Sequence, residues 1–141
     1  MRARCSWGDG GLVNAREKIE GYLVRLGLSY QEPSPGTWVV SDSQKGLHNL
    51  VISLANSHVI VRMNVMEAPV QGREKLFEEL LRLNAADLVH GAYGLEGRYV
   101  VIIDTLEVDG IGLEEFEGTL DAIGLAVAQH YRILSPYRAK A

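Results

Sequence analysis

The residues most suggestive of chemistry lie in the stretch GAYGLEG, where Gly91, Gly94 and Gly97 recur at every third position directly after His90. Glycine-rich loops bind phosphate when a strand leads into the glycines and a helix N-terminus follows them. Here the segment after Gly97, RYVVIIDTLEV, is rich in β-branched residues and predicts a strand. We therefore predict a β-hairpin, in which Gly97 supplies a positive φ at the turn and the other two glycines permit a bulge or a close approach.

Metal chemistry is not favoured by the spacing of the possible ligands. No histidine is paired with another histidine or a cysteine at i, i+2 or i, i+4, the spacings that metal sites on one element use; the four are His48, His58, His90 and His130. His130 falls near the end of a predicted helix, where the helix dipole alone accounts for it. We predict no metal site.

Nucleophilic and acid–base catalysis also lack a recognisable constellation. The single cysteine, Cys5, stands in a glycine-bearing N-terminal segment with no neighbouring base, and we interpret it as an unreactive thiol. No G-x-S-x-G elbow occurs, and Asp104 and Glu107 lie three apart on a predicted strand, so they point to opposite faces. We predict that the protein is not an enzyme and needs no cofactor; an enzyme using the glycine hairpin and His90 is the third-ranked alternative.

Composition narrows the class of protein. The 141 residues are 47% hydrophobic and 23% charged, which predicts one globular domain with a substantial core. The net charge is −4 and lysines and arginines form no cluster, so we expect no nucleic-acid partner. The apolar runs are shorter than the roughly 18 residues of a membrane span, so we expect no membrane partner.

Apolar spacing and turn residues predict the elements that would position these side chains. A helix is expected from a capping box at Asn14 and Glu17 to a C-terminal glycine, Gly27. The proline-containing segment LSYQEPSPG then predicts a loop. Three strands with short turns follow and predict an antiparallel meander over residues 37–66. The rest of the chain predicts a helix over roughly 71–83, the glycine hairpin with a long strand from Arg98, and a helix over roughly 113–132.

The order α-β-β-β-α-β-β-α predicts an α+β fold with a five-stranded, mostly antiparallel sheet and flanking helices. Residues 1–11 are expected to form a flexible N-terminal tail, residues 12–135 a single domain, and residues 136–141 a C-terminal tail.

The second half of the chain, about residues 72–132, resembles the YbjN family. The shared pattern is an LLxLN helix end, an aromatic-glycine hairpin, and an L-x-x-D-G turn that leads into an E-E-apolar helix start; the matching positions here are Leu80, Leu81, Leu83, Asn84, Tyr93, Gly94, Leu106, Asp109, Gly110, Glu114, Glu115 and Phe116. The fold of that family is similar to that of class I type III secretion chaperones. The resemblance implies a small cytoplasmic bacterial protein, a homodimer and no enzymatic activity.

The leading hypothesis is a non-catalytic dimeric module that binds another protein, in a regulatory, chaperone-like or adaptor-like role. Its motivation is the helix EKLFEELLRL, whose apolar stripe is wider than one sheet face requires. We expect the dimer or partner interface at Phe77, Leu80, Leu81 and Tyr93. The alternative is a small-ligand sensor with a pocket between the sheet and the first helix, lined by Trp38 and Tyr22.

Overall fold

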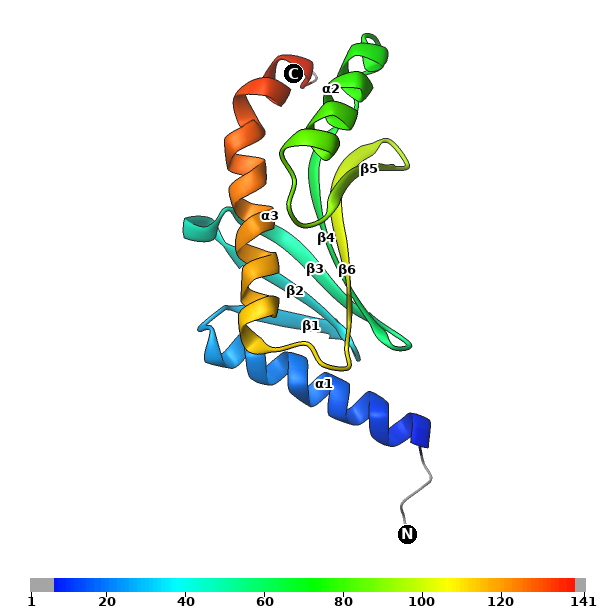
Figure 1. Ribbon diagram of the computed structural model, residues 1–141, viewed down its shortest axis with the longest axis vertical. Helices are drawn as coiled ribbons and strands as arrows, with labels where there is room; N and C mark the ends of the chain where they lie inside the picture. The colour runs from blue at the N-terminus through cyan, green and yellow to red at the C-terminus, as the bar shows by residue number, and fades with distance from the viewer. Residues whose placement is uncertain (1–6, 139–141) are drawn as a thin grey trace.

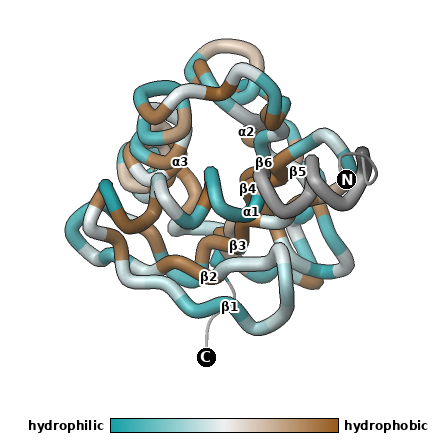
Figure 2. The backbone as a smooth tube through the Cα atoms, turned by 90° about the horizontal axis from the view of Figure 1, so that it is seen from below, coloured by the Kyte–Doolittle hydropathy of each residue, from teal (hydrophilic) through white to brown (hydrophobic). Residues whose placement is uncertain are grey.

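The computed structural model describes the backbone of residues 7–138 and the side chains of residues 15–138. Three helices lie on one side of an antiparallel sheet (Figures 1 and 2). The elements in chain order are α1 (Trp7–Arg25), β1 (Tyr30–Ser34), β2 (Thr37–Asp42), η1 (Ser43–Lys45), β3 (Leu47–Ala55), β4 (His58–Glu67), α2 (Arg73–Ala86), β5 (Ala92–Glu96), β6 (Tyr99–Glu107), α3 (Leu113–Leu134) and η2 (Ser135–Tyr137). The α+β class and the antiparallel pairing are as predicted.

The sheet has six strands in the order β1-β2-β3-β4-β6-β5, so the prediction of five strands is wrong by one. The additional strand is β1, which lies within the segment predicted as a loop and pairs with β2 at the edge of the sheet. An edge strand needs hydrogen-bond donors on one side only, so it tolerates Pro33. The same proline also protects this edge from pairing with another chain.

Helix α1 begins at Trp7, so Asn14 is an interior residue of the helix and not its N-cap. The predicted tail and domain boundaries remain expectations, although α1 already covers part of residues 1–11 and η2 part of residues 136–141. The other end of α1 is as predicted, because Gly27 has a φ of +70°. The amides of Gly27 and Leu28 donate to the carbonyls of Val24 and Leu23, which is the hydrogen-bond pattern of a Schellman C-cap.

Two tight turns set the register of the sheet. Asn56 and Ser57 connect β3 to β4, in one of the short turns that the predicted meander requires, with Ala55 opposite His58. Gly97 and Arg98 connect β5 to β6, with Glu96 opposite Tyr99, and Gly97 has a φ of +60°. Primed two-residue turns require this positive φ. The three glycines therefore belong to a hairpin, as predicted.

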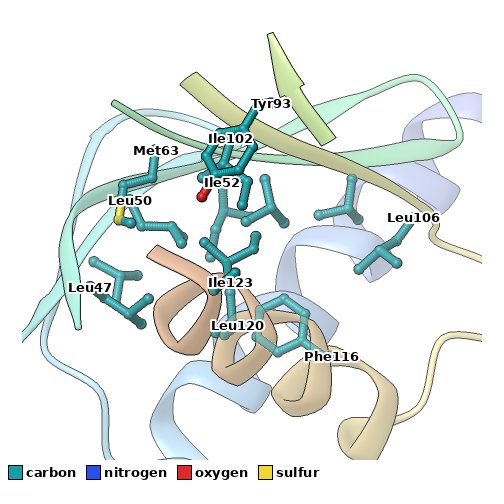
Figure 3. Packing of buried hydrophobic residues seen from close by; sticks show 14 of the residues in the cluster. Leu47, Leu50, Ile52, Met63, Tyr93, Ile102, Leu106, Phe116, Leu120 and Ile123 are labelled. Atoms are coloured by element: carbon teal, nitrogen blue, oxygen red, sulfur yellow. The ribbon is translucent and has the colours of Figure 1, made fainter. Parts of the chain in front are cut away.

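The core lies between the sheet and α3 (Figure 3). Phe116, Leu120 and Ile123 project from α3 toward the face of the sheet that carries Ile52 and Ile102. A bulge in β4 between Asn64 and Met66 turns Met66 into this core, in the place that strict alternation would give to Val65.

Candidate protein-binding groove

A small apolar groove lies between α2 and the edge strand β5. It encloses about 190 Å³ and is lined by Phe77, Leu80, Leu81, Asn84, Tyr93, Gly94 and Leu95. All four residues predicted from the sequence as an interface line this groove together. Leu80 and Tyr93 form its buried wall, each 6% exposed, whereas Leu81 is 67% exposed and Leu95 49% exposed. Two large aliphatic side chains are therefore turned toward solvent at the mouth of an apolar recess.

The amphipathic character of α2 explains why one helix serves both core and groove. Leu76, Leu80 and Leu83 are buried beneath it, and Phe77 and Leu81 continue the apolar stripe past the edge of the core. The guanidinium of Arg73 lies 5.5 Å from the centre of the Phe77 ring, close enough for a cation–π contact. The stripe is thus wider than the sheet covers, as the sequence indicated.

Asn84 joins α2 to the edge of the sheet. Its side-chain oxygen accepts a 2.7 Å hydrogen bond from the Tyr93 amide, and its side-chain nitrogen donates to the Tyr93 carbonyl at 3.2 Å. Tyr93 is opposite Ile102 at a position where the backbone groups of an antiparallel strand point away from its neighbour. The asparagine therefore occupies the two backbone groups that an added strand would need at this point.

The hydroxyl of Tyr93 enters a buried polar chain behind the groove. The ring extends from β5 toward α3 (Figure 3), and its Oη lies 2.7 Å from Nδ1 of His130. Nε2 of His130 lies 3.4 Å from a carboxylate oxygen of Asp87, the C-cap residue of α2. Burial raises the pKa of Tyr93 to about 12. The Tyr93 hydroxyl therefore remains protonated throughout the physiological range.

His130 is the functional candidate that sequence reasoning missed. The helix-dipole explanation is insufficient, because the side chain is only 3% exposed and both ring nitrogens have a partner. A signal was present: His130 follows Ile123 and Val127 at helical spacing, on the stripe that faces the core. Leu95 was missed as well, although it shares a face of β5 with Tyr93 two positions earlier.

The residues of the two alternative hypotheses have structural roles. Trp38 is fully buried, and Tyr22 packs on Phe116 with 5.6 Å between ring centres, so both belong to the core. A side chain at Gly91 would come within 2.8 Å of the carbonyl oxygen of Ile103, which is the predicted close approach. Nδ1 of His90 lies 3.9 Å from a carboxylate oxygen of Asp104. The hairpin geometry contradicts a nucleotide-binding loop, since a strand and not a helix follows the glycines.

Two further observations concern residues 7–138 only. Nowhere in this range do three or more histidine, cysteine or acidic side chains gather in a way that would hold a metal ion. None of the helices in it combines the length and the apolar character needed to cross a membrane.

The fold is that of the type III secretion chaperone-like α+β proteins. YbjN from E. coli has a similar structure, with a TM-score of 0.65 and 16% identity over 83% of this chain and 91% of that one. A chain of the heterodimeric ExoU–SpcU complex from the type III secretion system of Pseudomonas aeruginosa is also similar, with a TM-score of 0.60 and 12% identity. The match covers 84% of this chain and 98% of that one. The structure of the Yersinia pestis secretion chaperone SycH in complex with a fragment of YscM2 is similar as well, with a TM-score of 0.59 and 13% identity. The match covers 82% of this chain and 98% of that one.

The chain belongs to the CesT_Tir_1 family, whose model matches residues 13–140. That match spans nearly the whole sequence, including α2, β5 and the C-terminal half of α3, which build the groove and the polar chain behind it. None of the curated proteins compared with the chain matches it significantly.

Proposed function

We propose that this protein is a non-catalytic, homodimeric protein-binding module of the chaperone or adaptor type, and that the groove between α2 and β5 is its contact surface. The observation that carries the proposal is the exposure of Leu81 and Leu95 at the mouth of an apolar recess whose wall is formed by Leu80 and Tyr93. Exposed apolar side chains that gather beside a recess are typical of sites where another protein docks.

The composition of the groove supports side-chain recognition. Aromatic residues, here Phe77 and Tyr93, are enriched at the cores of protein interfaces, and tyrosine is among the residue types that contribute most binding energy when water is excluded around them. Because Asn84 already occupies the outward backbone groups of Tyr93, the groove favours a partner that inserts apolar side chains over one that adds a strand to β5.

Family membership and the structural neighbours support the same class of activity. SpcU and SycH are each found in complex with another protein, ExoU or a fragment of YscM2. Protein binding is therefore the activity that we carry over, without the identity of those partners. Family membership also supports a cytoplasmic location and a role without catalysis.

A small-ligand sensor is the less favoured function. The space between the sheet and α1 holds the side chains of Trp38 and Tyr22 themselves. A thermal-shift screen of metabolites tests this alternative, because a ligand that binds the folded state raises its melting temperature.

The oligomeric state tests the leading proposal. Size-exclusion chromatography with light scattering at micromolar concentration should give twice the chain mass of 15.5 kDa. Leu81→Glu places a charge in the contact surface and should yield the single-chain mass, because an unpaired charge is costly to bury in an interface. The matched control is Leu125→Glu, at a leucine of α3 with 58% exposure that does not line the groove, which should remain dimeric.

Partner capture tests whether a different protein, and not only a second copy of this chain, binds in the groove. Affinity purification from the native cell followed by mass spectrometry should recover a protein with the wild-type chain and with Leu125→Glu, but not with Leu81→Glu. A wild-type chain that elutes at 15.5 kDa contradicts the homodimer. A partner retained equally by all three chains contradicts the groove as its binding site.

A further inference from the structure

The polar chain behind the groove joins three elements through one buried imidazole. His130 on α3 contacts Tyr93 of β5 through Nδ1 at 2.7 Å and Asp87, at the end of α2, through Nε2 at 3.4 Å. Tyr93 is also a wall of the groove, and Asp87 is an exposed residue. This series of polar contacts therefore runs from solvent, through the core, to the proposed binding surface.

The protonation state of the imidazole decides which way the inner hydrogen bond points. The Asp87 carboxylate can only accept, so the neutral tautomer that suits it carries its proton on Nε2, which faces Asp87 at 3.4 Å, and leaves Nδ1 to accept from the Tyr93 hydroxyl. In the charged ring both nitrogens are donors, so Nδ1 donates to the Tyr93 oxygen and the hydroxyl proton must turn away. Among the described residues, that oxygen has His130 as its sole hydrogen-bond partner. The turned hydroxyl is then a buried donor with no acceptor in this part of the chain.

At Nε2 the charged ring is stabilised, because an imidazolium attracts the Asp87 carboxylate more strongly than a neutral ring does. Asp87 and Tyr93 are the titratable groups that face His130 from α2 and β5. Proton uptake thus strengthens the attraction to α2 and leaves the Tyr93 hydroxyl proton without an acceptor at the groove wall.

We propose that Asp87, His130 and Tyr93 form a proton-sensitive latch that fixes the Tyr93 wall of the groove when His130 is neutral and loosens it when His130 is charged. The regulatory consequence, weaker binding in the groove at acidic pH, rests on the proposed function of the groove. The latch itself does not, because it is a property of the isolated chain.

Nuclear magnetic resonance of the Leu81→Glu chain, which we expect to be monomeric, tests the latch without a second copy in the groove. Histidine changes charge between about pH 5 and pH 8, and its ring nitrogen shifts report tautomer and charge directly. Across this range, the methyl signals of Leu80 and Leu95 should change together with the ring signals of His130. Tyr93→Phe keeps the aromatic wall and removes the hydroxyl, so the methyl signals should no longer follow the ring signals of His130.

His130→Gln and His58→Gln complete the comparison. His58 is exposed at the turn between β3 and β4, so its replacement should leave the methyl titration unchanged, whereas His130→Gln should abolish it. Methyl signals that do not follow the His130 ring, or an imidazole that keeps one charge over the whole range, would overturn the latch.

Binding is measured separately. Dimer dissociation followed by light scattering at about pH 7.5 and about pH 5.5 should show about tenfold weaker association at the lower pH, a factor that corresponds to about 1.4 kcal/mol. His130→Gln should remove the difference. A chain that is monomeric at both values contradicts the proposed dimer, and the methyl signals still decide the latch.

Discussion

At the scale of single residues, Asn84 shows how one side chain serves both stability and specificity. It stands in the LLxLN pattern that carries the family resemblance, and the structure supplies a physical reason for an asparagine there. Only a side chain with both a donor and an acceptor satisfies the amide and the carbonyl of Tyr93 together. A leucine of the same size would leave both groups without a partner at the edge of the sheet.

Replacement of Asn84 should therefore destabilise the fold. Asn84→Ala removes two hydrogen bonds and should lower the free energy of unfolding by about 1–2 kcal/mol. Urea denaturation followed by circular dichroism measures the change. The control is Asn64→Ala, at an exposed asparagine of β4, where we expect the free energy of unfolding to fall by less than about 0.5 kcal/mol. Equal losses in the two variants would contradict the edge role of Asn84.

The buried hydroxyl of Tyr93 predicts a loss of stability at alkaline pH. Burial raises its pKa to about 12, above the value of about 10 for tyrosine in an unfolded chain. The folded state therefore holds this proton more tightly, and the associated stability is complete below about pH 10 and is lost as the pH rises toward about 12. The loss should not exceed about 2.7 kcal/mol, from two pH units at about 1.36 kcal/mol each.

Urea midpoints measured between about pH 9 and pH 12 test this dependence. Tyr93→Phe should show a smaller alkaline loss than the wild type, whereas Tyr99→Phe, at a tyrosine of β6 with 37% exposure, should behave as the wild type does. If Tyr93→Phe loses as much stability as the wild type, the ionisation of Tyr93 does not contribute.

At the scale of elements, α3 packs so closely on the turn between β2 and β3 that a glycine is required inside the helix. A Cβ at Gly124 would overlap the carbonyl oxygen of Lys45 in η1. Elsewhere in a helix, glycine to alanine is stabilising by about 1 kcal/mol, because alanine loses less backbone entropy. At Gly124 the overlap with backbone atoms outweighs that gain.

Gly124→Ala should therefore destabilise the protein by about 1–3 kcal/mol, the usual cost of overpacking. Gly118, in the same helix, provides the matched control, since a Cβ there meets no atom within 4 Å. Gly118→Ala should stabilise the fold by up to about 1 kcal/mol. Chemical denaturation of both variants measures the difference, and stabilisation of both would show that helix propensity, not packing against η1, decides the outcome.

Most elements could be predicted from the sequence because their periodicity and turn residues agree. The β3–β4 meander, the glycine hairpin and α3 follow from alternation, two-residue turns and an apolar stripe. β1 could not be predicted, because prolines and a glycine are typical of a loop and an edge strand alike. The four predicted groove residues lie together because the apolar stripe of α2 extends beyond the edge of the sheet. His130 was missed because its partners, Asp87 and Tyr93, come from distant segments.

At the scale of the whole molecule, the fold is retained while the sequence is not. YbjN shares the architecture at a TM-score of 0.65 with only 16% identity. Such a core needs apolar residues of suitable size and pattern at its buried positions, which many sequences provide. Under the proposed function, side chains at the surface select the partner, so the exposed rim of the groove, Leu81 and Leu95, is where we expect specificity to be set.

A dimer formed through the groove should also make the stability of the protein depend on its concentration. A subunit interface stabilises the folded chain by mass action, so the melting temperature should rise with concentration, by an amount equivalent to about 1.4 kcal/mol per mole of dimer for each tenfold increase. Differential scanning calorimetry over a hundredfold range measures this. Leu81→Glu should melt at one temperature throughout, while Leu125→Glu should follow the wild type. A wild-type melting temperature that does not change with concentration would contradict folding coupled to dimerisation through this surface.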